Sequence, residues 1–196
     1  MGEKKTKNVV IIALCLTLIF MGVGFAALSQ NINIEATGTV SGKTAWDIHY
    51  ATFALNEKGG NAADTTPEAT AGGVKYLDTA KTTATVTFTL TAPRDYVEYK
   101  GTITNFGSID AKLNTYTSSF NTENEYVTKT ITIGGESIAA DESHNVTSPA
   151  IALVKGNTAG SSTDVVVRYT LKDTVTELPE AAQTVTDSIV FGFVQK

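Results

Sequence analysis

Beyond residue 30 the chain alternates between apolar and polar side chains with a period of two. The clearest run is 83–92, in which Ala84, Val86, Phe88 and Leu90 alternate with threonines. One apolar face and one face of stiff, β-branched threonines are typical of a half-buried strand. Similar alternation recurs at 32–36, 46–50, 97–103, 165–171 and 189–193, and more weakly at 74–77, 126–133 and 150–154.

Nine or ten short strands separated by Gly- and Asn-rich turns predict an all-β fold. We expect an antiparallel β-sandwich or jelly roll over residues 30–196, with a closed barrel as the alternative. In this fold Trp46, on an alternating strand, is interpreted as a core residue. Residues 56–73 are expected to form a long, disordered loop. The only helical hint is at 177–183, after Pro179.

The first 29 residues follow another pattern. Three lysines, Lys4, Lys5 and Lys7, precede an apolar run over residues 9–28 that ends in small side chains. This is the layout of an export signal. Small residues at positions −3 and −1 favour cleavage after Ser29, so that Gln30 becomes the first residue, or else before Ala27.

The length of the apolar run leaves a second possibility open. About 20 apolar residues exceed the usual export signal and are enough for a membrane-spanning helix. Residues 1–29 are therefore predicted to be a cleaved signal peptide or a retained anchor helix, with 9–28 as the only contact with the membrane. Either way, residues 30–196 are expected outside the cell as a single domain.

Composition narrows the classes of partner. Removing the three lysines and Glu3 from the 15 basic and 20 acidic residues leaves 12 and 19, a net charge near −7. Because no cluster of basic residues lies beyond the three lysines, nucleic acid is a poor partner. The only cysteine, Cys15, lies in the apolar run, so the exported part contains none. Its length of about 165 residues is sufficient for one core without disulfides.

The sequence predicts neither catalysis nor a cofactor. His49 is expected on the solvent face of a strand, and His144 lies in a loop beside Asp141 and Glu142. No paired-histidine spacing, nucleophile elbow or Asp-rich calcium loop is present. We therefore expect no metal site and no enzymatic activity.

A short motif carries the most specific information. A strand ends at Asn105, and Gly107 is expected to supply the positive φ of a tight hairpin turn. After the turn, Ile109, Ala111 and Leu113 resume the alternation. This turn motif (Asn105, Gly107, Asp110, Ala111), the long apolar signal and the strand after it resemble the TasA/camelysin group of Gram-positive surface proteins. The resemblance covers the plan of the chain and short motifs within it. No residues here support the peptidase activity attributed to some members of that group.

The resemblance implies a jelly roll, processing by a dedicated signal peptidase and assembly into extracellular biofilm fibres. Residues 30–40 offer a strand for that assembly, with the apolar side chains Ile32, Ile34, Ala36 and Val40. Such a strand can complete the sheet of a neighbour by strand addition, and an interface that does not close produces a filament. It can equally be the first strand of its own domain.

Two functions therefore compete. The first is a structural subunit of a matrix or surface fibre, with copies of itself or related surface subunits as partners. The second is a non-polymerising surface module, anchored or released, whose long loops bind a glycan or a host protein. A type IV pilin is disfavoured because no acidic residue lies within 9–28.

Overall fold

The computed structural model describes residues 46–69, 74–120, 124–156, 158–174 and 183–196. The chain divides into two units, Met1–Val40 and Ser41–Lys196, and every described residue belongs to the second. In these residues the structure is all-β and antiparallel, as predicted, and contains no helix. The bounds are β1 (Ile48–Gly59), β2 (Ala63–Asp64), β3 (Thr83–Leu90), β4 (Tyr96–Asn105), β5 (Ala111–Ser118), β6 (Val127–Ile133), β7 (Glu136–Ser137), β8 (Ala139–Ala140), β9 (Val146–Ser148), β10 (Ala152–Leu153), β11 (Ser162–Leu171) and β12 (Gln183–Gln195).

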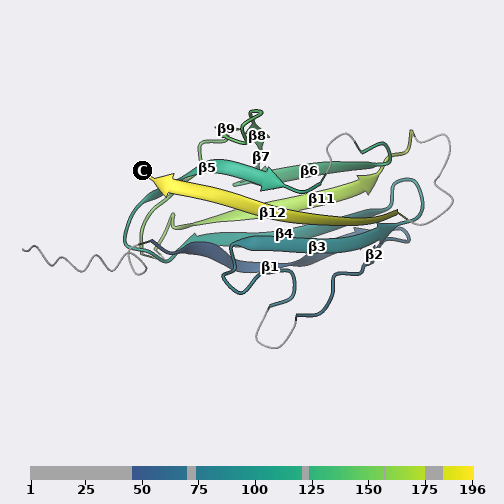
Figure 1. Ribbon diagram of the computed structural model, residues 1–196, viewed down its shortest axis with the longest axis horizontal. Helices are drawn as coiled ribbons and strands as arrows, with labels where there is room; N and C mark the ends of the chain where they lie inside the picture. The colour runs from purple at the N-terminus through teal and green to yellow at the C-terminus, as the bar shows by residue number, and fades with distance from the viewer. Residues whose placement is uncertain (1–45, 70–73, 121–123, 157, 175–182) are drawn as a thin grey trace, which may run out of the picture. The chain divides into compact units, whose positions relative to one another are not determined.

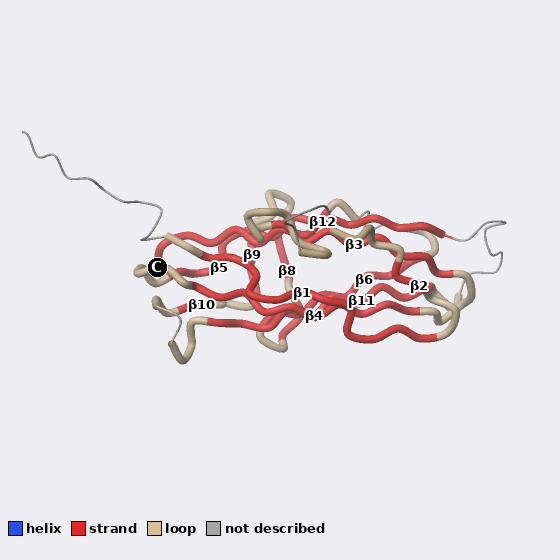
Figure 2. The backbone as a smooth tube through the Cα atoms, turned by 90° about the horizontal axis from the view of Figure 1, so that it is seen from below, coloured by secondary structure: helices blue, strands red, loops and turns tan. Residues whose placement is uncertain are grey.

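The strands form two five-stranded sheets and one small ribbon. The first sheet has the order β1-β4-β11-β6-β7, the second has the order β10-β5-β12-β3-β2, and β8 pairs with β9. Figures 1 and 2 show the two large sheets as two layers. The long strands β1, β3, β4, β5 and β6 alternate between the sheets, so the chain crosses from one layer to the other at each of these connections.

Strand β3 shows how the sequence pattern becomes a layer. Ala84, Val86, Phe88 and Leu90 are buried, while the threonines between them are only partly covered. The hydroxyls on this outer face pair with strand β12, as in the 3.1 Å contact between Thr87 and Thr186. The alternation in β3 therefore places its apolar side chains in the core and its threonines on the outer surface, as predicted.

The two sheets pack face to face through aromatic side chains. Phe88 of the second sheet lies against Tyr169 of the first, with ring centroids 4.5 Å apart. Tyr50 on β1 meets Phe191 on β12 edge to face at 6.3 Å. These pairs belong to one hydrophobic cluster that draws on both sheets. The described residues therefore form a β-sandwich with a single core.

Three local predictions need correction. Residues 56–73 were expected to form a disordered loop, but 56–59 continue β1, because their backbone pairs with β4 up to the contact of Gly59 with Tyr96, and Ala63–Asp64 form β2, which pairs with β3. Residues 74–77 form a turn held by an isolated bridge instead of a strand. Trp46, expected in the core, precedes β1 and is 37 % exposed. The helical hint at 177–183 falls almost entirely outside the described residues.

Candidate functional site

The turn motif is a crossover between the two sheets. β4 ends at Asn105 in the first sheet, and β5 begins at Ala111 in the second. The prediction of a hairpin is therefore wrong, since these two strands do not pair with each other. The alternating pattern is the same for a hairpin and for a crossover, and only the partner strands tell them apart.

Asn105 holds this crossover in shape. Its side chain is 1 % exposed, donates to the carbonyl of Ile109 at 2.8 Å and accepts from the Gly107 amide at 3.0 Å. Asp110 fixes the far side, where its carboxylate accepts from the Lys155 amide at 3.0 Å and its carbonyl from the Lys196 amide at 3.0 Å. The motif residues thus join the β4–β5 crossover to the loop after β10 and to the chain end.

Gly107 does not play the role predicted for it. The described glycines with positive φ are Gly60, Gly134, Gly135, Gly156 and Gly160, and Gly107 is not among them. Its backbone is instead buried between neighbouring segments. Its amide donates to Asp47 at 3.1 Å as well as to Asn105, and its carbonyl accepts from Gly156 at 2.7 Å.

Exposed apolar side chains gather around this crossover. Among the described residues, five large apolar side chains are exposed, and four of them lie at this end of the sandwich: Trp46, Phe106, Val154 and Val194. Hydrogen bonds connect their segments, for example from the Phe106 amide to Asp47 at 2.7 Å. We call these four residues the apolar end. In Figure 1 it lies where β1 begins and β12 ends, beside the C-terminus.

His49 is part of the same region. Its ring stacks on Phe106 at a centroid distance of 4.6 Å, and its Nδ1 lies 2.8 Å from Asp47. The side chain is 23 % exposed, so the solvent-facing position predicted for it is only partly realised. His144 lies far along the chain, at a turn whose backbone is capped by Asp141. Neither histidine belongs to a group of three potential metal ligands among the described residues.

A small cavity with a mixed polar and apolar lining opens beside the start of β1. It measures about 30 Å³ and is lined by Ile48, Tyr50, Ile103, Phe191 and Phe193, among others. The hydroxyl of Tyr50 is buried there without a hydrogen-bond partner in the described part of the chain. Burial therefore raises the pKa of Tyr50 far above its ordinary value.

β1 is an edge strand with an open side. It pairs with β4 on one side, and on the other the only backbone hydrogen bond within the described residues is from Tyr50 to Lys81, at 2.9 Å. In the second sheet, the edge strands β2 and β10 are only two residues long, and loop segments bond to the outer sides of β3 and β5 beyond them. β3 donates from Thr85 to Tyr76, and β5 donates from Leu113 to Ile151. β1 therefore has the longest uncovered edge among the described strands.

Two bulges divide that edge. The pairing of β1 with β4 shifts between Tyr50 and Thr52 and again between Leu55 and Glu57. The stretch 51–55 between them carries no charge, whereas Glu57 and Lys58 follow the second bulge. Bulges and charges on an edge oppose uncontrolled pairing. The accessible part is therefore one short, uncharged segment, with room for about five residues of a partner strand.

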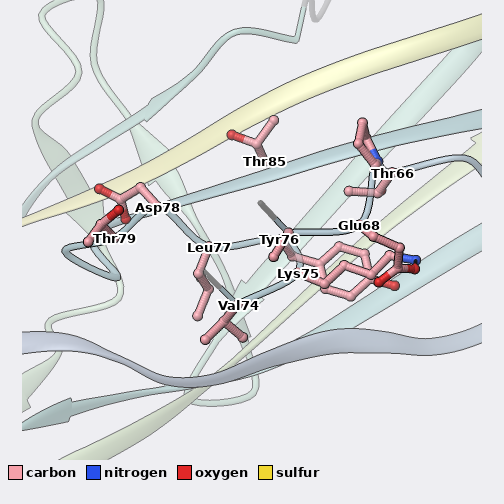
Figure 3. A pocket seen from close by; sticks show the side chains of 11 residues that line it. Thr66, Glu68, Val74, Lys75, Tyr76, Leu77, Asp78, Thr79 and Thr85 are labelled. Carbon is pink, nitrogen blue, oxygen red and sulfur yellow. Dashed lines mark hydrogen bonds and ion pairs between the residues drawn. The ribbon is translucent and has the colours of Figure 1, made fainter. Parts of the chain in front are cut away.

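A second hollow is lined mainly by residues that lie between β2 and β3 in the chain. It measures about 430 Å³, and Figure 3 shows its lining, which includes Thr66, Glu68 and residues 74–79. Lys75 bridges Glu68 at 2.8 Å and Asp64 at 3.5 Å. Burial and the hydrogen bond to Asp64 raise the pKa of Tyr76 to about 12. These charged and polar groups pair with one another, while Val74 and Leu77 add apolar surface, so the described lining of the hollow is mixed in character.

Two sets of predicted site residues lie outside the described residues. These are the cleavage residues Ala27, Ser29 and Gln30, and the assembly residues Ile32, Ile34, Ala36 and Val40. In the part that is described, no helix is long and apolar enough to cross a membrane.

The sequence analysis missed a buried charged pair, Lys129 and Asp187. Both occupy apolar positions of an alternating strand: Lys129 follows the phase of Val127 and Ile131, and Asp187 that of Val185 and Ile189. A charge in the core phase of a strand is a signal visible in the sequence, because such charges are rarely buried unless paired.

Comparison with known proteins adds no further assignment: no protein-family profile, curated protein or solved structure matches this chain.

Proposed function

We propose that this protein is an exported structural subunit of an extracellular fibre, assembled by strand addition. The donor is residues 30–40 of one copy, and the acceptor is the uncovered edge of β1 in the next. The observation that carries the proposal is this edge, open over residues 51–59 in the described structure. A strand with unpaired backbone groups is a template for another extended chain.

The dimensions of donor and acceptor agree. The apolar core of the donor, 32–36, spans five residues, as does the uncharged stretch 51–55 between the bulges. Donor and acceptor belong to the same chain but lie at different places on it. The contact is therefore head to tail, and repetition of such a contact extends into a filament unless it closes into a ring.

The finer features of the sequence analysis belong to the same proposal. The alternation of β1, β3, β4, β5 and β6 between sheets supports a jelly-roll path, in which the chain also passes repeatedly between two sheets. A signal peptidase would cut before Gln30 and free the donor strand. The subunit would then act at the cell surface or in the matrix of a Gram-positive biofilm.

The test uses protein that begins at Gln30. We expect concentration-dependent fibres by electron microscopy. Replacing both Ile32 and Ile34 with Asp removes two anchors, each worth roughly 1.5–3 kcal/mol of burial, and should leave a folded monomer. The matched control replaces Asn31 and Asn33 with Asp, which adds the same charge on the opposite face and should preserve the fibres.

A contrary result would be a double variant of Ile32 and Ile34 that unfolds as a monomer. The strand would then belong to its own sheet, and fibre assembly would lose its mechanism. The alternative, a non-polymerising binding module, would gain support. Its best surface is the 430 Å³ hollow around Lys75 and Glu68.

A further inference from the structure

Lys129 and Asp187 meet in the core from opposite sheets. Lys129 lies on β6 of the first sheet, and Asp187 lies on β12 of the second. The lysine Nζ is 2.5 Å from Oδ2 of Asp187, and their side chains are 5 % and 0 % exposed. The rings of Tyr116 and Tyr169 lie 5.3 and 5.6 Å from the lysine nitrogen. An amine and a carboxyl group are therefore held in contact in a largely water-free, aromatic site.

Hydrogen-bond donors surround both oxygens of the carboxyl group. Oδ1 accepts from the Ser118 hydroxyl at 2.8 Å, the Phe120 amide at 3.0 Å and the Ser119 hydroxyl at 3.3 Å. Oδ2 accepts from the Tyr169 hydroxyl at 2.5 Å. Burial, together with the charge of Asp187, raises the pKa of Tyr169 well above its ordinary value, so this hydroxyl retains its proton.

We propose that Lys129 and Asp187 condense into an intramolecular amide bond that links the two sheets. The substrates are the two side chains themselves, and the product is an isopeptide crosslink. This inference does not depend on the fibre proposal, since it concerns a single folded chain.

The reaction balances without another reactant. A proton passes from the lysine ammonium to the aspartate within the ion pair, which leaves a neutral amine and a neutral acid. Nζ attacks Cγ, and the charge that develops on Oδ1 is stabilised by the Phe120 amide and the Ser118 hydroxyl, as in an oxyanion hole. Tyr169 donates its proton to the departing Oδ2 and recovers one from the nitrogen. One Nζ–Cγ bond forms, one Cγ–Oδ2 bond breaks, and one water leaves.

The environment favours this product. Burial alone would raise the pKa of Asp187, but the charge of Lys129 and the hydrogen bonds lower it, so the resting pair is ionised. An amide removes both of these buried charges. The fixed donors and the enforced contact replace the ordering that the reaction would need in solution. The amide crosslink would stabilise the domain as a disulfide does, because it joins residues 58 apart in the chain. The domain itself contains no cysteine.

The experiment is intact-mass spectrometry of the folded wild-type chain, incubated at neutral pH and then fully denatured. We expect the measured mass to be lower, by one water, than the mass calculated from the amino-acid sequence. Tryptic mapping should find one branched peptide containing Lys129 and Asp187. The Lys129→Arg variant retains the charge but cannot form the bond at that position, so it should show the full mass.

The exposed pair Lys100 and Asp164 provides the matched control within the same molecule. Their charged atoms lie 3.3 Å apart, but both side chains are half exposed and are not buried in an aromatic site. We expect their peptides to remain unlinked and Lys100→Arg to retain the loss of water. The proposal is overturned if the wild-type chain keeps its full mass after incubation, or if the lost water maps to other residues.

Discussion

The side-chain amide of Asn105 donates to the backbone carbonyl of Ile109 over 2.8 Å, which closes the crossover between the two sheets. Replacing Asn105 with Ala leaves this carbonyl and the Gly107 amide without that partner in a buried site. We expect a loss of roughly 1–3 kcal/mol in the free energy of unfolding, measured by chemical denaturation. The control Asn56→Ala removes an amide of the same type from an exposed contact with Glu98 and should change stability by less. Equal losses of unfolding free energy in the two variants would show that burial of Asn105 does not account for the effect.

Two glycines with positive φ separate backbone strain from steric contact. A Cβ at Gly60 would lie 2.0 Å from Oδ1 of Asp95, whereas a Cβ at Gly135 would meet nothing within 4 Å. Both positions penalise a side chain through φ, by about 1 kcal/mol or more. We therefore expect Gly60→Ala to lower the melting temperature more than Gly135→Ala. Equal shifts would mean that the turn near Asp95 relaxes freely.

Asp95 links stability to pH. Its side chain is 2 % exposed and accepts from the amides of Asn61, Thr91 and Ala92. Burial alone would raise its pKa, but these hydrogen bonds outweigh burial and lower it. A lowered pKa in the folded state means that the stabilisation is present above the unfolded value, about 4, and is lost as pH falls through the folded value.

The variant Asp95→Asn tests this linkage. We expect it to be less stable than the wild type at neutral pH, because an amide cannot accept from all three donors. The difference in unfolding free energy should be constant near neutral pH and shrink as the pH falls from about 5 through the lowered pKa of Asp95, where the wild-type carboxylate becomes protonated. A difference that stays constant over this range would contradict the role assigned to the charge.

Cysteine pairing tests the acceptor edge directly, since residues 30–196 contain no cysteine. Two preparations beginning at Gln30, one with Asn33→Cys and one with Ala54→Cys, are mixed and oxidised. We expect a disulfide between the two chains, because Ala54 is exposed at the centre of the β1 edge. The control places the cysteine at Thr130, exposed on β6 of the same sheet, and should give less crosslinking. Equal yields from both would remove β1 as the acceptor.

The sequence by itself determined the class of fold. In strands such as β3 and β11, alternation of apolar and polar residues sets which side chains are buried, and the structure confirms this position by position. This is possible because successive side chains of a strand point to opposite faces, so the signal is contained in a few neighbouring residues.

Tertiary structure alone decided which strands pair and what meets across the core. The sequence around Asn105 predicts a hairpin turn, yet its strand and the next belong to different sheets. Lys129 and Asp187 are visible as charges in core positions, but their contact requires two sheets to face each other. A period of two fixes a residue's face and says nothing of its partner strand, because pairing joins residues far apart in the chain.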